Sequence, residues 1–180
     1  MLWKLPQAIL VAAFLPFATA DFWLTYLNQR VSDDDGVDVY EGGTFTSDPP
    51  QWSCDDWDIF NHPIHQIADD VSGSKHGMRV DPKTNKGPPL YRDPLDVVEF
   101  NTWKTNPGHQ TIYADRGYVM VDINGHSTGQ CHLNRTFTIQ LFCGTSFTDI
   151  SLRGSSMFFC ETHLMPSDFD STTVLEFQGA

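Results

Sequence analysis

The residues best suited to acid–base chemistry gather in the last third of the sequence. Glu161 and His163 are two positions apart on a predicted strand, so their side chains share one face. A general acid and a general base can be arranged in this way, and Arg153 and His132 could complete the set. Because such sites are rare among polar strand residues, we expect ordinary surface positions here. The four residues are the candidate site only for an enzymatic function.

Glycoside hydrolysis requires two carboxylates on opposite sides of a cleft. Glu99 and Glu161 both lie on predicted strands, where an acidic side chain points either into a barrel or out to solvent. We expect both carboxylates to face solvent.

Other catalytic and metal-binding patterns fail on spacing. Gly154-Ser155-Ser156 lacks the Gly-x-Ser-x-Gly spacing of a serine nucleophile and predicts a hairpin turn. His62-Pro63-Ile64-His65 lacks the i, i+4 spacing of a helical zinc pair. Asp33-Asp34-Asp35-Gly36 places Gly42 where an EF-hand needs its last glutamate, and it predicts a solvated turn between strands. No metal and no cofactor is expected.

One locally basic stretch interrupts an acidic sequence, whose formal net charge is −12. Residues 81–96 are rich in Pro, Gly, Lys and Asn, which predicts a long exposed loop. The candidate binding residues in it are Lys83, Lys86, Tyr91 and Arg92. We expect a solvated connector, and contact with an anionic partner is the alternative.

Four aromatic residues could form a sugar-stacking platform, because aromatic faces carry a large apolar area. They are Tyr40, Trp52, Trp57 and Trp103. Trp52 and Trp57 flank Cys54, so packing over a disulfide is the alternative explanation.

Residues 1–20 have the pattern of a cleavable secretory signal peptide. Lys4 supplies the positive charge, Ala8–Phe17 is a short apolar run, and Ala18-Thr19-Ala20 fits signal peptidase. The apolar run is too short to span a bilayer, which requires about 20 apolar residues. The sequence therefore predicts a secreted, extracellular protein that begins near Asp21 and does not insert into a membrane.

Export makes the cysteines a predicted disulfide framework of two bridges. The four residues are Cys54, Cys131, Cys143 and Cys160. Three pairings are open, and the adjacency of predicted strands favours Cys143 with Cys160 and Cys54 with Cys131. Asn134-Arg135-Thr136 is an N-glycosylation sequon, so a glycan is expected on Asn134.

Alternation of apolar and polar residues predicts half-buried strands over much of the chain. We expect strands at Phe22–Leu27, Val97–Trp103, Thr111–Tyr113, Tyr118–Ile123, Thr136–Cys143, Phe147–Leu152, Met157–Thr162 and Thr173–Phe177. Asp115-Arg116-Gly117 and Asn124-Gly125 fit tight hairpins, so His109 to Cys160 predicts an antiparallel meander.

A single helix is expected at residues 63–71, where Ile64, Ile67, Ala68 and Val71 follow helical spacing. The predicted fold class is mainly β, a β-rich α+β domain. Its antiparallel meander would form a disulfide-bridged sandwich or open barrel with this one short helix. We expect one domain over residues 21–180.

Three segments resemble uncharacterised small secreted, cysteine-containing proteins of filamentous fungi. They are HQTIYADRGYVMVDINGHSTGQC at His109–Cys131, DDVSGSKHGMRV at Asp69–Val80 and DFWLTYL at Asp21–Leu27. Some members of that group carry a cysteine where this chain has Val80. The resemblance implies a secreted fungal protein of the effector-candidate type, and it brings no catalytic residues.

These observations favour a non-enzymatic effector or surface-binding module that acts outside the cell on a host or cell-surface protein or glycan. The alternative is a small secreted hydrolase, ribonuclease-like or glycosidase, that uses carboxylate and histidine catalysis. A cell-wall-associated structural protein is the third interpretation. The acidic charge disfavours tight binding to nucleic acid, which relies on clustered Lys and Arg.

Overall fold

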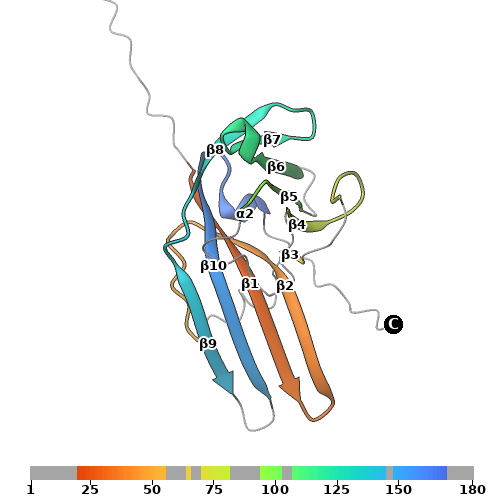
Figure 1. Ribbon diagram of the computed structural model, residues 1–180, viewed down its shortest axis with the longest axis vertical. Coiled ribbons are helices and arrows are strands. Elements are labelled where there is room, and N and C mark those ends of the chain that lie inside the picture. Colours follow the sequence, from red (N-terminus) through yellow and green to blue (C-terminus); the bar gives the residue numbers. More distant parts are fainter. Residues whose placement is uncertain are drawn as a thin grey trace, which may run out of the picture.

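Along the longest strands, apolar and polar residues alternate, so each strand presents two faces with different surroundings. The computed structural model describes residues 20–55, 64–65, 70–81, 94–102, 107–144 and 148–169. Within these ranges the chain is mainly β, with an antiparallel sheet nearly closed into a barrel and one short α-helix (Figure 1). The predicted fold class is confirmed.

The described residues form a sheet of ten strands. The order across it is β3-β2-β1-β10-β8-β7-β6-β5-β4, and β9 also pairs with β10. The strands are β1 (Phe22–Asp33), β2 (Gly36–Thr46), β3 (Ile64–His65), β4 (Gly77–Asp81), β5 (Val97–Asn101), β6 (His109–Tyr113), β7 (Val119–Asp122), β8 (Ser127–Leu133), β9 (Thr138–Gly144) and β10 (Asp149–Thr162). A 3-10 turn, η1 (Ala114–Arg116), joins β6 to β7, and helix α2 (Pro166–Phe169) follows β10.

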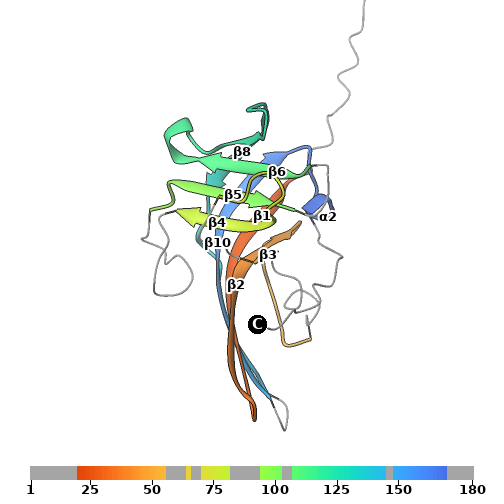
Figure 2. The ribbon, with the colours of Figure 1, turned by 90° about the vertical axis from the view of Figure 1, so that its right-hand side faces the viewer.

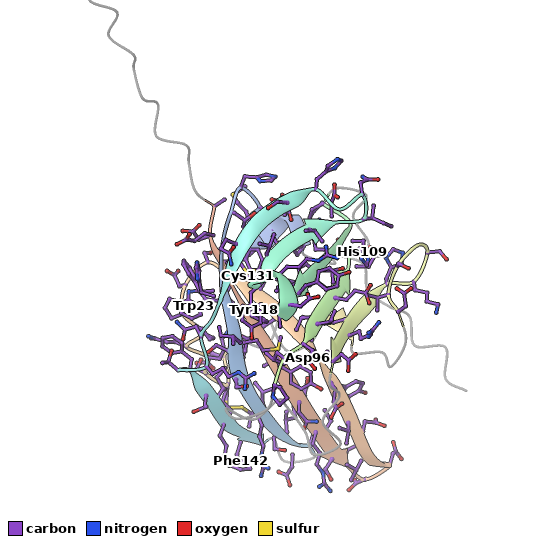
Figure 3. The ribbon with its side chains drawn as sticks, turned by 45° about the horizontal axis from the view of Figure 1, so that its top comes forward. Trp23, Asp96, His109, Tyr118, Cys131 and Phe142 are labelled. Atoms are coloured by element: carbon purple, nitrogen blue, oxygen red, sulfur yellow. A yellow bond between two sulfur atoms is a disulfide. The ribbon has the colours of Figure 1, made fainter. Side chains whose placement is uncertain are left out.

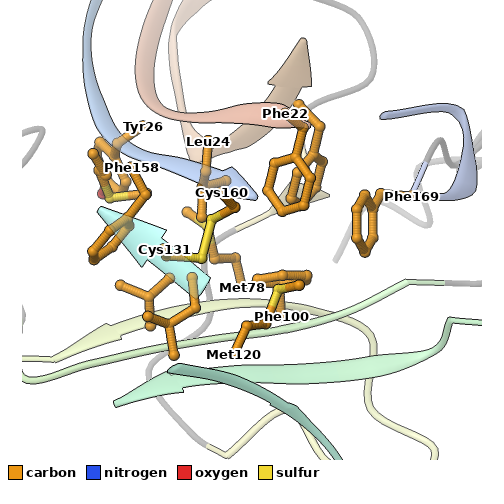
Figure 4. Close-up of a cluster of buried hydrophobic side chains, with 14 of the residues drawn as sticks. Phe22, Leu24, Tyr26, Met78, Phe100, Met120, Cys131, Phe158, Cys160 and Phe169 are labelled. Carbon is orange, nitrogen blue, oxygen red and sulfur yellow. A yellow bond between two sulfur atoms is a disulfide. The ribbon is translucent and has the colours of Figure 1, made fainter. Parts of the chain in front are cut away.

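The barrel nearly closes where β4 returns to β2 and β3. Gly43 of β2 makes this approach feasible, because a Cβ there would lie only 2.5 Å from the Met78 sulfur of β4. The interior is a buried apolar cluster that combines aromatic, aliphatic and sulfur-containing side chains (Figure 4). Phe169 of α2 packs into it, with ring centroids 5.0 Å from Phe22 and 4.4 Å from Phe45.

Strand β10 belongs to two parts of the molecule. Its first half, Asp149–Ser155, pairs with β9, and its second half, Phe158–Thr162, pairs with β8. Strand β1 pairs with β10 along both halves. As a result β9, the first half of β10, β1 and β2 extend beyond the barrel as four neighbouring strands (Figures 1 and 2). We name these four strands the projecting sheet.

One face of the projecting sheet is covered by residues 47–55, and the opposite face is not. On one face Leu27, Ile139 and Leu152 form a small buried cluster against which Trp52 packs. The disulfide between Cys54 and Cys143 ties residues 47–55 to β9 on this side. Residues 47–55 therefore close this face by a covalent bond and an apolar contact.

The opposite face is the continuation of the barrel interior. On β1 the residues that fill the barrel, Leu24 and Tyr26, are followed at the same alternation by Asn28, Arg30 and Ser32. The sequence thus changes from apolar to polar at the point where the barrel ends. Arg30 is exposed, so this face of the projecting sheet is open to solvent.

The turns predicted at Asp33–Gly36, Asp115–Gly117 and Asn124-Gly125 are confirmed. The Asp33 carboxylate accepts hydrogen bonds from the backbone N–H groups of Asp35 (2.9 Å) and Gly36 (3.1 Å), which fixes the exposed β1–β2 turn. Gly117 ends η1 with φ of 66°, a conformation that favours glycine. The meander prediction is correct for β6, β7 and β8 only, because β9 pairs with β10 and not with β8.

The favoured disulfide pairing is wrong. The bridges are Cys54–Cys143 and Cys131–Cys160. The two strands predicted at 147–152 and 157–162 are one continuous β10, so β9 and β8 neighbour different halves of it. Cys131 lies opposite Cys160, whereas Cys143 lies opposite Ile150, ten residues earlier on the same strand.

Two other local predictions are wrong because the segments concerned are paired strands of the sheet. Gly154-Ser155-Ser156 is not a turn, because it lies in the middle of β10, with Gly154 between Leu27 and Ile139. Ile64 and His65 are not helical, because they pair with Gly43 and Gly42 as strand β3. The remaining expected helix residues 63 and 66–69, and the strand predicted at 173–177, lie outside the described residues. In the described residues, no helix has the length and apolar character needed to cross a bilayer.

Candidate functional site

The acid–base set predicted from the sequence does not converge. His132 Nε2 lies 3.7 Å from Glu161 Oε2, with the two side chains 54% and 60% exposed. Arg153 lies eight residues before Glu161 on the same strand, which separates them by about 26 Å at the rise of an extended chain. His163 is exposed just beyond β10. The exposed His132–Glu161 contact is thus the part of the set that the fold brings together.

A different carboxylate, Glu99, is buried at the centre of a polar cluster. It lies on β5 opposite Arg79 of β4 and Thr111 of β6. Its Oε2 atom lies 3.4 Å from Arg79 Nη1, and its Oε1 atom lies 3.4 Å from His109 Nε2. The Glu99 side chain is only 10% exposed, so the prediction that it faces solvent is wrong.

The cover over Glu99 comes from residues 70–76. The backbone N–H of Val71 donates to Glu99 Oε2 at 3.4 Å. The Asn101 side chain donates to the carbonyl oxygens of Gly73 (3.2 Å) and Lys75 (2.8 Å), which holds the same segment against β5. Alternation along β5 places Glu99 away from the barrel interior, but it cannot reveal a segment that crosses this outer face. Residue spacing therefore indicated Glu99 only as one of two strand carboxylates and not the cluster around it.

Burial is the main reason why the pKa of Glu99 is raised, and the charge of Asp70 adds to the effect. The Val71 N–H, His109 and Arg79 oppose the rise. The pKa of Asp70 is lowered, chiefly because its carboxylate accepts a hydrogen bond from the Ser72 backbone N–H. The pKa values of these two neighbouring carboxyl groups are thus shifted in opposite directions, a pattern that is also found in acid–base pairs.

His109 adds a second titratable group to the cluster. Its side chain is 8% exposed, and its Nε2 atom also lies 3.0 Å from the Thr111 hydroxyl. Its Nδ1 atom is buried and has no hydrogen-bond partner in the described part of the chain. Arg79 Nη2 lies 3.2 Å from Asp81 Oδ2. These two side chains are the more exposed members of the cluster, with exposed fractions of 29% and 50%. The arrangement combines a carboxyl group, an imidazole and a guanidinium, which can transfer protons and stabilise an anion.

A second candidate site is a groove of about 560 Å³ on the open face of the projecting sheet. Ser151 of β10 lies at its centre, opposite Arg30 on β1 and Phe142 on β9. Arg153 is the next residue of β10 on the same face. Ser32 and Asp149 also line the groove. Figure 3 shows Phe142 at the projecting end, far from His109 in the barrel.

The carboxylate that lies two strands from Arg153 is engaged by other side chains. Glu41 lies in the same cross-strand row, but it accepts hydrogen bonds from Asn28 Nδ2 at 2.9 Å and from the Tyr26 hydroxyl at 3.2 Å. Burial and Glu41 together raise the pKa of Tyr26, so this hydroxyl stays a donor. Among the ion pairs between described residues, none includes Arg30 or Arg153.

The other predicted binding residues lie on the covered face of the projecting sheet or outside the described residues. Tyr40 is on the covered face, opposite Gln29. Lys83, Lys86, Tyr91 and Arg92, with Trp57 and Trp103, lie outside the described residues. Trp52 packs on the covered face of the projecting sheet, which agrees with the alternative that it packs beside a disulfide.

Asn134 lies between β8 and β9, where its Oδ1 atom accepts hydrogen bonds from the Thr136 hydroxyl and from the Thr136 backbone N–H. The two sequon residues are thus in direct contact. In the described residues, no group of three or more His, Cys, Asp or Glu side chains could hold a metal ion.

No protein-family model, curated protein or solved structure matches this chain.

Proposed function

We propose that this chain is a secreted, non-enzymatic binding module of the effector type, which acts outside the cell through the open face of the projecting sheet. The observation that carries the proposal is the exposure of apolar side chains on this face. Phe142 is 69% exposed, Val39 is 58% exposed and Val37 is 47% exposed. Val37 and Val39 are neighbours on β2, and Phe142 lies three strands away on β9. Exposed apolar area spread over one face in this way is characteristic of interaction surfaces.

The position of these residues supports a common role. Val39 lies opposite Arg30, and Val37 lies opposite Ser32, so both share a face with the groove residues. The other face of the same sheet is closed by Trp52 and the Cys54–Cys143 bridge. A sheet with one stabilised face can leave the other face available for a partner. The signal-peptide pattern and the disulfides are consistent with a partner outside the cell.

Binding of the secreted form to intact cells and cell walls tests the proposal. The variant Val37→Ser, Val39→Ser, Phe142→Ser should lose at least about tenfold in affinity, since each substitution removes apolar contact area. Ile123→Ser, Leu133→Ser, Met165→Ser is a matched control, because these residues are also exposed apolar residues but lie outside the projecting face. Equal binding by both triple variants would exclude the projecting face as the binding surface.

The second candidate function is acid–base hydrolysis at the Glu99 cluster, and the observation that favours it is the buried contact of Glu99 with His109 and Arg79. Purified protein is assayed on RNA and on glycosidic substrates. Glu99→Gln should reduce any activity at least about 100-fold, because a carboxamide cannot transfer the proton. Glu161→Gln should leave the rate unchanged. The reverse pattern would instead favour the exposed His132–Glu161 contact.

A further inference from the structure

We propose that the groove on the projecting sheet binds an acidic oligosaccharide, with its carboxylate or sulfate groups on Arg30 and Arg153 and a sugar ring on Phe142. This inference rests on the proposed function and names the ligand class of the same face.

The arginines are placed so that one small ligand can reach both. Arg30 lies directly across from Ser151, and Arg153 is two residues along β10. Diagonal neighbours of this kind are about 7 to 8 Å apart at Cα, within the reach of two long side chains that converge on one anion. Guanidinium groups bind carboxylates and sulfates with two parallel hydrogen bonds, which gives directional recognition.

The charge of the groove differs from that of the whole protein. The chain carries a formal net charge of −12, yet the described groove residues include two arginines and one carboxylate, Asp149. Asp149 lies at the end of β10, opposite Ser32, and is two residues from Ser151, as Arg153 is, so the described groove residues carry one more positive than negative charge. The groove therefore attracts an anion locally, while the remaining surface repels a long polyanion. A short acidic ligand fits both conditions better than a nucleic acid, whose binding depends on many phosphate contacts.

Phe142 and the polar residues around it fit a sugar. Phe142 lies opposite Ser151 and is 69% exposed, so its ring can cover the apolar face of a pyranose. Ser151 and Gln140 share this face and offer hydroxyl and amide groups for sugar hydroxyls. The volume of about 560 Å³ lies in the usual range for small-molecule sites, which corresponds to a few sugar units.

The test measures binding of the secreted protein to defined probes by calorimetry at low and high salt. The probes are an oligogalacturonate, a sulfated heparin oligosaccharide, a neutral oligosaccharide, a phosphopeptide and a single-stranded oligonucleotide. We expect one or both acidic oligosaccharides to bind, with affinity that falls as salt rises, and the other three probes to bind at least tenfold more weakly. Tighter binding of the phosphopeptide or the oligonucleotide would overturn the proposal.

A charge-matched pair of variants separates the groove from general attraction. Arg30→Gln, Arg153→Gln should weaken binding of the acidic oligosaccharide at least about 30-fold, because each arginine forms charge-assisted hydrogen bonds. Arg116→Gln, Arg135→Gln has the same net charge and should bind as the unchanged protein does. Equal losses in both double variants would overturn the proposal. Phe142→Ala should weaken binding several-fold at both salt concentrations, since stacking is not screened.

The cell-binding assay distinguishes this inference from the proposed function. If Arg30→Gln, Arg153→Gln binds cells normally while the apolar triple variant does not, the face is a binding surface but its ligand is not acidic. If the triple variant also binds normally, the proposed function itself is wrong.

Discussion

At the scale of single residues, Glu99 shows how an acidic side chain acquires an unusual environment without an unusual sequence. Val98 and Phe100 on either side of it point into the barrel, as alternation predicts. The burial of Glu99 is due to Val71 and its neighbours, which approach from another part of the chain. A contact of this kind is set by tertiary packing, so residue spacing alone cannot predict it.

The raised pKa of Glu99 leads to a pH dependence of stability. Since burial raises its pKa in the folded protein, Glu99 contributes stability that is fully present below the unfolded pKa, near 4.5. This contribution is lost as the pH rises through the higher folded pKa. We therefore expect the stability of the unchanged protein relative to Glu99→Gln to decrease between about pH 4 and pH 7.

The measurement is urea unfolding of both proteins across this pH range. The difference between the free energies of unfolding of the two proteins excludes the contributions of carboxyl groups that are not coupled to Glu99. Glu161→Gln, which removes an exposed carboxylate, is the control and should give a difference that stays nearly constant with pH. A difference for Glu99→Gln that does not change with pH, or that grows as the pH rises, would show that Glu99 is not destabilised by burial.

At the scale of elements, the sequence indicates some strands and misses others, since β2, β4 and β8 were not among the expected strands, and it indicates which strands are neighbours poorly. The pattern of β6, β7 and β8 was predictable because short turns with Gly117 and Asn124-Gly125 determine which strands pair. The length of β10 was not predictable, since Gly154-Ser155-Ser156 has the composition of a turn. In the structure these small residues lie in the sheet, and a Cβ at Gly154 would come within 2.9 Å of the Tyr26 carbonyl oxygen. Close strand packing, and not a turn, accounts for Gly154.

The Cys54–Cys143 bridge should control whether residues 47–55 stay on the projecting sheet. It closes a span of 89 residues, for which the chain-entropy model gives a stabilisation of about 4 to 5 kcal/mol. We expect Cys54→Ser, Cys143→Ser to lower the free energy of unfolding by roughly 2 to 4 kcal/mol. Limited proteolysis should then cut first within residues 47–55.

Urea unfolding and mass spectrometry of the proteolytic fragments measure both effects. Cys131→Ala, Cys160→Ala serves for comparison, because those two cysteines are buried within the barrel core. That variant should lose more stability and be cut at many sites. Unchanged protease resistance within 47–55 in the Cys54→Ser, Cys143→Ser variant would mean that Trp52 alone holds the segment.

At the scale of the whole molecule, the barrel stabilises the fold and the projecting sheet carries the proposed binding residues. The barrel core, with Phe169 and the Cys131–Cys160 bridge inside it, stabilises one end of β1 and β10. The same two strands then continue into the projecting sheet and carry Arg30 and Arg153 on its open face. Arg30 was not a candidate in the sequence, and Arg153 was one only for acid–base chemistry. The proximity of the two arginines depends on the register between β1 and β10, strands that lie far apart along the chain.

Secretion would account for the disulfides and for a glycan at the sequon, since both form in the secretory pathway, and it would place the binding face outside the cell. Expression of all 180 residues in a eukaryotic secretory host should release a protein that begins at Asp21 and carries one glycan on Asn134. The sequon requires both Asn134 and the hydroxyl residue at position 136. Asn134→Gln and Thr136→Ala should each lose the glycan and migrate as the enzymatically deglycosylated protein does. Thr136→Ser keeps the sequon and should retain the glycan.

Terminal sequencing and intact mass measure these outcomes. A product that stays in the cell with residues 1–20 attached would contradict both the signal peptide and the extracellular role derived from it.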